Sequence, residues 1–403
     1  MKKYVFVTCS VFGVGGGQQY VSNKTEYLRA KGYKVYTVSN SPFSIGGKII
    51  YRGLDEAVNG IFTELQYLPE AYPKRKMRKI IQSVVEFIDP CDSDEIVLES
   101  NSLICAVWAE KIAERVKGKH IVFSVSEHND IDKYFCEFLE FKFARGEFAT
   151  IGIKTMKPLF AMSSIVNEEN CPILKAFLGD NVSDYFDERL NEFEKKDHSI
   201  CIIGRGDKPY VEYACLEVAD FCAKYPDKTF SIGLISEFRD LNKAARIKAK
   251  FEVLKNVNVY YWGYFSSFPT ALFKMFDLYI GGAGCASLPY RQNALTLAMD
   301  LYSDKPLGLM GYNGEKTIDA KIADADMQQC LKDALFDKQY LKKEFIKPVV
   351  LTGAEVFSHH DKLLETGSNT KQYYIKHNKF VGIKDKLKVR FPFLLKIKKA
   401  IGR

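Results

Sequence analysis

Short apolar runs alternate with longer helical patterns over the first 150 residues of the chain. The strand-like runs lie at residues 4–9, 34–38, 95–98, 120–125 and 148–150. The helical patterns lie at residues 18–31, 74–88 and 102–116. Alternation of this kind predicts a parallel sheet with crossover helices.

A second series of the same kind follows the charged stretch 184–197. Its strand-like runs lie at 199–203, 229–235, 257–261 and 278–280, and its helical runs at 210–224, 268–276 and 289–302. Since 403 residues exceed the size at which one core stops growing, two domains are expected. We predict an α/β protein with two Rossmann-like, doubly wound domains, at residues 1–183 and 198–350. C-terminal helices and a basic tail would follow at residues 351–403.

The composition is that of a globular protein, with 47% hydrophobic and 27% charged residues. No stretch reaches the roughly 18 uncharged apolar residues of a membrane span, and the N-terminus lacks the apolar region of a signal peptide. The ten cysteines stand singly, without a Cys-x-x-Cys pair, as reduced thiols in a cytosol do. We therefore expect a cytoplasmic protein without a metal site.

The net charge of +8 is concentrated at the C-terminus. Residues 376–403 hold ten Lys or Arg against one Asp, interleaved with aliphatic and aromatic residues, while the rest of the chain is nearly neutral. Such a segment is attracted to an anionic bilayer, at about 1 kcal/mol per cation. Nucleic acid is the competing partner, which we rank lower because the charge is confined to one terminus. A solvated tail with a few docked residues is the third interpretation.

A glycine loop containing Gly15, Gly16 and Gly17 follows the first predicted strand. The order strand, glycine loop, helix places backbone N–H groups at the carboxyl edge of a sheet, where phosphate and sugar oxygens bind. A nucleotide P-loop requires Lys where Gln18 stands, and a dinucleotide site requires an acid near Ser39. The alternative is that these glycines only permit a tight turn.

The second half contains a loop with two cations. The predicted strand 199–203 runs into a turn that holds Arg205 and Lys208, just before a helical pattern. Arg offers a bidentate fork and Lys a point charge, a pair that suits a diphosphate whose charge grows as it leaves. The alternative is that both are ordinary loop charges.

A third glycine loop, with Gly282 and Gly284, follows the predicted strand 278–280. Ser287 is expected to cap the next helix, and Pro289 fits the first turn of that helix. The N-terminus of this helix is expected to face the same crevice as the Arg205 loop.

Taken in order, these features resemble a GT-B glycosyltransferase of the bacterial surface-polysaccharide type, a divergent member like those of glycosyltransferase family 4. The glycines at 15–17 resemble the first loop of that family, and Gly204-Arg205 with Lys208 resembles its donor-phosphate residues. The run 256–264, which ends in Tyr264, resembles its strand beside the nucleotide base. The resemblance covers roughly residues 1–310 and implies two domains that face a central cleft.

The chain departs from that family where the donor sugar binds. Many retaining members carry two glutamates, eight apart, before a Gly-x-Pro that corresponds to residues 304–306 here. Counting back from Pro306 places Met299 and Arg291 at those positions. The stereochemical outcome is therefore left open. The donor-binding residues that the resemblance implies in this half are Arg205, Lys208, Tyr264, Gly282, Gly284, Ser287 and Arg291.

Polar residues end two predicted strands of the first half. One strand ends in the triplet 99–101, and the next is followed by Glu127, His128 and Asp130. Both ends are expected to reach the crevice. An inverting enzyme needs a general base, and these three residues are the catalytic candidates, with His128 favoured. Helix capping is the alternative role for such a cluster.

The resemblance implies a metal-independent glycosyltransferase that needs no cofactor and uses a nucleotide-diphosphate sugar as its donor. The acceptor would be lipid-linked or an oligosaccharide, and the enzyme would lie at the inner face of the membrane. Two alternatives stay open: a GT-B nucleotide-sugar epimerase or hydrolase, and a catalytically silent GT-B subunit that binds a glycan or a partner enzyme. A nucleic-acid-binding role ranks last.

Overall fold

The computed structural model describes most of the chain as two compact units. The described residues are 1–42, 51–125, 131–177, 182–265, 267–301, 305–312, 326–347, 349–366, 372–376, 386 and 389. Unit 1 comprises Met1–Gly179 and Leu351–Arg403, and unit 2 comprises Asp180–Val350. The chain therefore leaves unit 1, builds unit 2, and returns to unit 1.

Unit 1 is built on a six-stranded parallel sheet in the order β3-β2-β1-β4-β5-β6. The strands are β1 (Lys2–Thr8), β2 (Tyr33–Ser39), β3 (Val58–Ile61), β4 (Glu95–Ser100), β5 (Lys119–Ser124) and β6 (Phe148–Thr150). The five strands predicted in this half are present. The order confirms the doubly wound prediction, because the chain moves outward from β1 in one direction and from β4 in the other.

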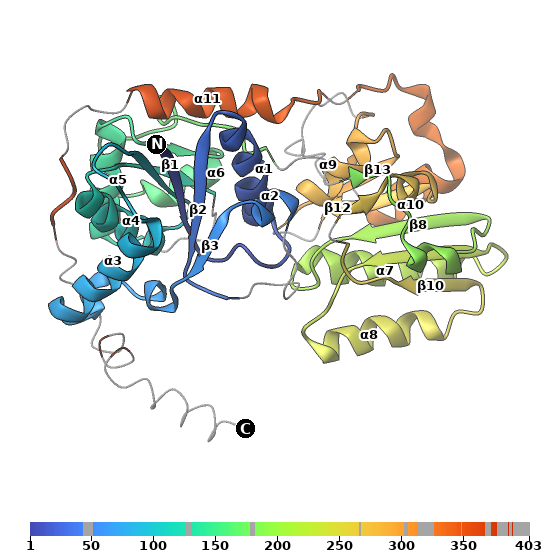
Figure 1. Cartoon of the computed structure of the whole chain (residues 1–403). Helices are drawn as coiled ribbons and strands as arrows, with labels where there is room; N and C mark the ends of the chain where they lie inside the picture. Colours follow the sequence, from blue (N-terminus) through green and yellow to red (C-terminus); the bar gives the residue numbers. More distant parts are fainter. Residues whose placement is uncertain are drawn as a thin grey trace. The chain divides into compact units, whose positions relative to one another are not determined.

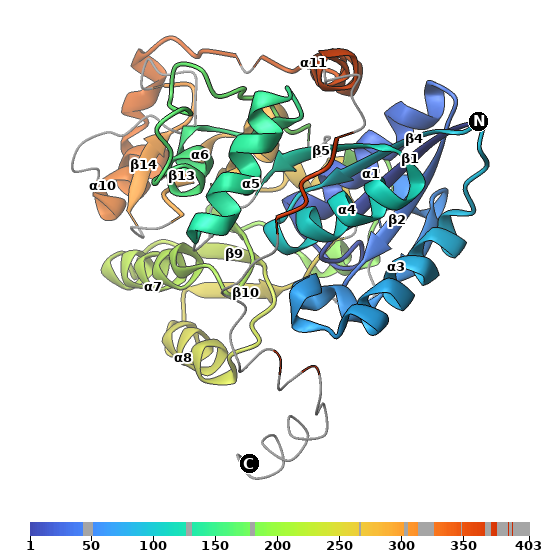
Figure 2. The ribbon, with the colours of Figure 1, turned by 90° about the vertical axis from the view of Figure 1, so that its left-hand side faces the viewer.

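Helices cover both faces of this sheet (Figures 1 and 2). They are α1 (Gly16–Ala30), α2 (Arg52–Asp55), α3 (Lys74–Ile88), α4 (Leu103–Val116), α5 (Lys133–Ala144), α6 (Ile153–Leu159) and α11 (Gly353–Thr366), with 3-10 turns η1 (Thr63–Gln66) and η2 (Pro69–Ala71). Alternate residues of β1 point to opposite faces. Val5 and Val7 pack in the cluster of α3 and α4, whereas Tyr4 and Phe6 pack in that of α1 and α11. The C-terminal helix α11 thus completes the core of unit 1.

Unit 2 repeats the topology, in the order β10-β9-β8-β12-β13-β14. Its strands are β8 (His198–Ile203), β9 (Phe230–Ile235), β10 (Val257–Tyr261), β12 (Leu278–Gly282), β13 (Thr296–Met299) and β14 (Pro306–Leu309), with a separate pair β7 (Val182–Ser183) and β11 (Phe268–Pro269). Its helices are α7 (Pro209–Lys224), α8 (Leu241–Glu252), α9 (Gly284–Arg291) and α10 (Met327–Lys332). They are joined by the 3-10 turns η3 (Glu188–Glu192), η4 (Thr270–Lys274) and η6 (Gln339–Lys342) and the π-helical turn η5 (Asp333–Asp337). Only β14 runs antiparallel to its neighbour among these six strands.

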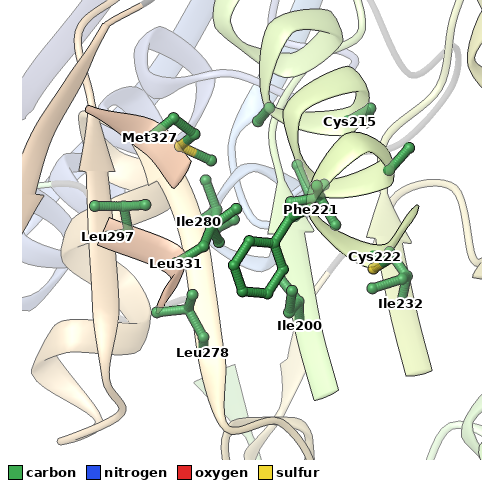
Figure 3. Close-up of a cluster of buried hydrophobic side chains, with 14 of the residues drawn as sticks. Ile200, Cys215, Phe221, Cys222, Ile232, Leu278, Ile280, Leu297, Met327 and Leu331 are labelled. Atoms are coloured by element: carbon green, nitrogen blue, oxygen red, sulfur yellow. The ribbon is translucent and has the colours of Figure 1, made fainter. Parts of the chain in front are cut away.

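The core of unit 2 is apolar. Phe221 projects from α7 over the sheet and lies among aliphatic side chains from β8, β12 and α10, including Ile200, Leu278 and Leu331 (Figure 3). A fully buried Phe, Leu or Ile contributes about 1.5–3 kcal/mol relative to an exposed one. This packing fixes α7 on the sheet, and with it the loop that precedes α7.

Two local predictions in unit 2 are wrong, and one helix was missed. Residues 268–276 form strand β11 and the 3-10 turn η4, because residues 268–269 pair with β7. Residues 289–302 contain the end of α9 and strand β13; Asn293 has φ of 59° after the helix, and β13 then inserts beside β12. Helix α8 was not predicted, since only Ile247 and Phe251 of it are buried and its apolar pattern is thin.

Candidate functional site

In each sheet the chain adds strands outward in one direction from one strand and in the opposite direction from its neighbour. The position between these two strands is the switch point. In unit 2 this point lies between β8 and β12, and in unit 1 between β1 and β4. In open α/β sheets, ligands bind outside the carboxyl ends of the strands at this switch point. In unit 2 the Arg205 loop follows β8, and Gly282 is the last residue of β12. Two of the predicted loops therefore meet at the switch point.

The Arg205 loop is a tight turn held by its backbone. The amide of Lys208 donates to the carbonyl of Arg205 at 2.9 Å. The guanidinium of Arg205 pairs with Asp207 at 3.0 Å, and its side chain is 33% exposed. A Cβ on Gly206 would lie 2.5 Å from the backbone oxygen of Glu237, which follows β9. Glycine is therefore required there, because the loop lies directly against the end of β9.

Tyr264 reaches the same loop from the end of β10. Its hydroxyl donates to the carbonyl of Glu237 at 3.5 Å. Burial raises the pKa of Tyr264, and a backbone hydrogen bond with Gly206 acts in the opposite direction. The preceding Gly263 has φ of 65°, a conformation that favours glycine. The predicted nucleotide-side tyrosine is thus placed beside the predicted phosphate loop.

The turn from β12 into α9 has a strained backbone. Ala283, the N-cap residue of α9, has φ of 48° and ψ of −122°. A non-glycine residue in such a region costs about 1–3 kcal/mol and is found mainly at functional sites. A Cβ on Gly282 would lie 2.9 Å from the ring of Tyr210, so the turn is also closely packed. Gly284 is exposed at the first position of the helix.

Tyr210 joins the two loops, and sequence reasoning missed it. Its side chain is buried, and its hydroxyl donates to the carbonyl of Ile203 at the end of β8. A Cβ on Gly204 would lie 2.3 Å from that hydroxyl. A side chain at Gly204 or Gly282 would therefore collide with Tyr210. The available signal was a tyrosine in the first turn of a helix that follows a Gly-x-Gly loop.

The Arg205 loop and the start of α9 follow the neighbouring strands β8 and β12, so both cations lie at the same sheet edge as the start of α9. Burial raises the pKa of the Cys285 thiol, in the first turn of α9, while a hydrogen bond with Tyr210 and the charges of Arg205 and Lys208 act to lower it. A helix N-terminus attracts anions because its first N–H groups lack intrahelical partners. The two side chains and the helix end therefore form one positive environment.

Two further residues contribute to this edge. Lys243 of α8 donates to the carbonyl of Gly206 at 3.2 Å and pairs with Glu212 at 3.4 Å. The hydroxyl of Ser236, directly after β9, is buried and has no hydrogen-bond partner among the residues that the structure describes. A buried unpaired hydroxyl is costly, so it is a natural partner for a ligand group. Neither residue was predicted from the sequence.

The glycines in the loop of unit 1 differ in whether their backbone conformation or packing requires glycine. Gly13 has φ of 95°, which favours glycine, and Gly15 is the N-cap of α1 in an extended conformation. Gly16 is the first residue of the helix. A Cβ on Gly17 would meet nothing within 4 Å. Packing therefore does not explain Gly17, and open space remains beside the start of α1.

No protein-family model matches the chain, and no curated protein matches its sequence. Solved structures do match. A glycosyltransferase from Rickettsia africae is 12% identical with a TM-score of 0.58, covering 99% of this chain and 98% of that one. Anabaena HepE, in complex with UDP and glucose, is 11% identical with a TM-score of 0.53, covering 90% and 96%. A putative UDP-N-acetylglucosamine 2-epimerase from Listeria monocytogenes is 9% identical with a TM-score of 0.50, covering 93% and 99%.

The chain has the GT-B fold. The predicted resemblance is confirmed at this level, while the family 4 assignment stays a prediction. At these identities the likeness establishes the fold, and the roles of individual residues rest on the geometry described above. In this chain, Arg205, Lys208, Tyr264 and Gly282 lie at the switch-point edge of unit 2.

Two predicted donor residues lie away from this edge or act differently. Arg291 is the last residue of α9, seven positions after Gly284, or about 10 Å along the helix axis. Ser287 does not cap the helix; its amide donates to the carbonyl of Ala283, which is the N-cap residue. Pro289 accordingly lies inside the helix instead of in its first turn.

The expectation that strand β4 presents its polar end to a crevice is wrong for Glu99 and Ser100. Glu99 is 1% exposed and accepts hydrogen bonds from Tyr4, Tyr20 and Lys24. Ser100 is fully buried. The local pattern could not reveal that buried partners from α1 and β1 would bind Glu99.

Ser100 also belongs to a buried network that resembles a catalytic triad in its contacts. Its hydroxyl lies 2.9 Å from Nε2 of His120, and Nδ1 of His120 lies 2.6 Å from Glu110. Ser100 is 0% exposed and His120 is 2% exposed. Because no substrate atom reaches a serine buried in this way, the network is structural. The candidates Glu127, His128 and Asp130 lie outside the described residues, after the end of β5.

Most of the basic tail, residues 376–403, also lies outside the described residues. Lys376 pairs with Glu137 of α5 at 2.9 Å, and Val389 is buried in the cluster of α3 and α4. Among the helices that the structure describes, none combines the length and hydropathy that crossing a bilayer requires.

Unit 1 also carries a basic surface on α3 and the end of α4. It surrounds a surface depression of about 1100 Å³. Its exposed cations form no ion pair with any described residue; they are Lys74, Arg75, Arg78, Lys79, Arg115 and Lys117. We call these six residues the basic face. Glu114 is the one acid that lines the depression.

Proposed function

We propose that this protein is a glycosyltransferase that moves a sugar from a nucleotide-diphosphate donor to a lipid-linked or oligosaccharide acceptor. The GT-B fold supports an enzyme that uses a nucleotide sugar. The observation that carries the proposal is the convergence of Arg205, Lys208 and the start of α9 at the switch point of unit 2.

This arrangement suits the departure of a nucleoside diphosphate. When the bond from the sugar to the diphosphate breaks, negative charge grows on the diphosphate oxygens. Arg205 would bind these oxygens through its fork, and Lys208 would add a point charge. The N–H groups at the start of α9 would bind the same anion. Donors fixed in advance stabilise the developing charge without reorganisation.

The remaining residues of this edge have positions that suit the rest of the donor. Tyr264 would border the nucleotide base, and the unpaired hydroxyl of Ser236 would donate to a donor oxygen. On the acceptor side, we assign proton removal from the acceptor hydroxyl to His128, with Glu127 and Asp130 as the other candidates. That assignment rests on their place after a strand of unit 1.

We propose that the enzyme works at the cytoplasmic face of a membrane. Two features support this: the basic tail 376–403 and the basic face on α3 and α4. Cations without acidic partners near them are attracted to anionic lipid headgroups. Val389 of the tail packs in the cluster of the same helices, at that part of unit 1.

A nucleotide-sugar epimerase is the second candidate. The Listeria protein of the same fold is a putative UDP-N-acetylglucosamine 2-epimerase, and the diphosphate site would serve either reaction. The two differ in whether an acceptor is needed. An epimerase converts the nucleotide sugar alone, whereas a transferase releases nucleoside diphosphate in proportion to the acceptor glycosylated. The silent-subunit alternative predicts weak or no binding of a nucleotide sugar.

The first experiment measures thermal stability against UDP, GDP, ADP, CMP and dTDP sugars. At one hundred times its dissociation constant, a bound nucleotide adds about 2.7 kcal/mol to the free energy of unfolding. Arg205→Ala and Lys208→Ala should each weaken binding by about 10- to 100-fold, since each removes charged hydrogen bonds worth about 1.5–3 kcal/mol.

The matched control is Lys248→Ala on α8. Lys248 is an exposed cation of the same unit, paired with Glu252 at 3.5 Å, and its loss should leave nucleotide affinity unchanged. Absence of stabilisation by every nucleotide sugar would contradict the transferase and favour the silent subunit. Equal losses of nucleotide affinity in all three variants would contradict a nucleotide site at this edge.

A further inference from the structure

Two cysteines that are distant in the sequence meet at the switch point of unit 1. Cys9 directly follows β1, and Cys105 lies in the first turn of α4, which follows β4. The register of β1 against β4 runs to Val7 opposite Ser100. Two positions further on, Cys9 is level with Ser102, the N-cap residue of α4. The pairing of β1 with β4 therefore places Cys9 at the start of α4.

The two thiols share a set of polar partners. The sulfur of Cys9 lies 3.4 Å from the hydroxyl of Ser102. The side-chain amide of Asn40, at the end of β2, donates to the sulfur of Cys105 at 3.5 Å. The thiols of Cys9 and Cys105 also lie close enough to influence each other's pKa. Polar groups from the end of β2 and the start of α4 thus surround the two sulfurs, and we call them the donor set.

The environment distinguishes the two sulfurs. The hydrogen bond from Cys105 is the largest influence on Cys9; with those from Ser102 and Asn40, and against the effect of burial, it lowers the pKa of Cys9 to about 6. The pKa of Cys105 is raised by its hydrogen bond to Cys9 and by burial. The start of α4 adds a favourable dipole for an anion. The lowered pKa favours the thiolate form of Cys9, and the raised pKa favours the protonated form of Cys105.

Access also differs among the cysteines. Cys9 is exposed at the sheet edge, whereas Cys105 is fully buried behind it. Cys91 is the other exposed cysteine among the described residues. It lies in the loop between α3 and β4, and no described side chain donates to its sulfur. Cys91 therefore provides an internal control for exposure without the donor set.

We propose that Cys9 is a modification site that reacts with peroxides, and that Cys105 resolves the product as a disulfide. The Cys9 thiolate attacks one peroxide oxygen; an S–O bond forms, the O–O bond breaks, and hydroxide leaves. The sulfur is oxidised to a sulfenic acid by two electrons, and the peroxide is reduced. The Cys105 sulfur then attacks the Cys9 sulfur; an S–S bond forms, the S–O bond breaks, and the Cys105 proton leaves with the hydroxyl as water.

The disulfide would link the end of β1 to α4 across the switch point, next to the glycine loop that starts α1. A dithiol reductant would reverse it by exchange. This inference does not depend on the glycosyltransferase proposal, since it concerns unit 1 and needs no nucleotide.

The test treats the full-length, reduced protein with a small molar excess of hydrogen peroxide and maps its thiols by peptide mass spectrometry. The expected product is a Cys9–Cys105 disulfide that dithiothreitol reverses. Cys105→Ser should leave the sulfenic acid unresolved, so that dimedone labels Cys9. Cys91→Ser should behave as the wild type.

A second measurement needs no variant. Iodoacetamide should alkylate Cys9 about fivefold faster than Cys91 at pH 7, because a larger thiolate fraction outweighs its lower nucleophilicity. The rate at Cys9 should fall through a midpoint near pH 6 as the solution is acidified. Equal rates at Cys9 and Cys91, or peroxide products without Cys9, would overturn the proposal. Cys9 oxidised without a Cys105 disulfide would overturn the resolving role.

Discussion

The two units share one topology but place their charges differently. Six Lys or Glu side chains of unit 1 are buried among the described residues: Lys3, Lys24, Glu99, Glu110, Lys142 and Glu147. Where the structure describes unit 2, its buried polar residues are Ser199, Ser231, Ser236 and Thr296. Unit 2 instead presents Arg205 and Lys208 at its sheet edge. In unit 1, the charged side chains pair with one another in the interior. In unit 2, Arg205 and Lys208 lie at the surface, where a ligand can reach them.

The first buried network of unit 1 centres on Glu99. Burial acts to raise the pKa of Glu99, but the charge of Lys24 and the hydroxyls of Tyr20 and Tyr4 hold it below its usual value. Burial lowers the pKa of Lys24, and Glu99 opposes that shift. His360 of α11 lies 3.4 Å from the Lys24 amine. The network therefore ties the returning C-terminal helix to β4 and α1.

The second network centres on Glu110 of α4. Lys142 of α5 donates to Glu110 at 3.0 Å and to Glu147 at 2.6 Å. The amide of Tyr374 donates to the other oxygen of Glu110 at 2.9 Å. Tyr374, which follows α11 in the sequence, is thus bound to the same buried charges.

The surface helices of the two units differ in the same respect. On α8 of unit 2, each cation has an acidic partner: Lys243 and Arg246 pair with Glu212, Lys248 with Glu252, and Lys250 with Asp220. On α3 of unit 1, Lys74, Arg75, Arg78 and Lys79 have none among the described residues. Both helices are basic in sequence. The acidic residues around α8 neutralise its cations, whereas the cations of α3 remain able to attract an anion.

Removing the buried carboxylate tests this comparison most strongly. Glu99→Gln should lower the free energy of unfolding by about 3–5 kcal/mol, because Lys24 is left as an uncompensated buried charge. Urea unfolding followed by circular dichroism measures the change. Arg205→Ala should change stability by less than about 0.5 kcal/mol, as expected of a surface loop.

The double variant Lys24→Met/Glu99→Leu separates charge from packing. Apolar residues of similar volume often replace a buried ion pair without loss. The double variant should therefore be more stable than Glu99→Gln. A double variant as unstable as the single one would show that shape, and not the unpaired charge, sets the cost.

The pH dependence of unit 1 provides the next test. Burial, and then the Lys24 charge, lower the pKa of His360 to about 4, from 6.5 in the unfolded chain. A neutral buried histidine stabilises the fold fully above pH 6.5. That stability, about 3 kcal/mol, is lost as the pH falls from 6.5 to 4.

His360→Gln should remove this part of the pH dependence, and denaturant unfolding between pH 7 and pH 4 measures it. His359→Gln is the matched control, because His359 is the exposed neighbour on the same helix. It should keep the wild-type profile. Parallel profiles for the wild type and His360→Gln would contradict a neutral buried His360.

Vesicle binding tests the surface helices. Arg75→Gln/Lys79→Gln should weaken binding to vesicles containing phosphatidylglycerol by about 2 kcal/mol at low salt, or about 30-fold, at about 1 kcal/mol per cation. Flotation or fluorescence titration measures the affinity. Arg246→Gln/Lys250→Gln on α8 removes two paired cations and should have little effect. Equal losses, or no binding by the wild type, would contradict the basic face as a membrane contact.

Much of the candidate donor site could be predicted because its parts are local in the sequence. A strand, a turn with Arg205 and Lys208, and a helix start are read from about a dozen consecutive residues. Parallel strands then bring their carboxyl ends to one edge by rule. The contributions of Tyr210, Lys243 and Ser236 could not be predicted, since each depends on contacts with another loop.

The sequence by itself determined the alternation of strands and helices, the two doubly wound units and the loops at their strand ends. These follow from the period of apolar positions and from glycine, which act over a few residues. Tertiary structure decided that Glu99 is a buried partner of Lys24, that residues 296–299 form a strand, and that Cys9 meets Cys105. Such features depend on which distant segments pair. Distant segments pair when their contact buries apolar surface and matches opposite charges over whole helices and strands. A pattern of a few consecutive residues does not contain that information.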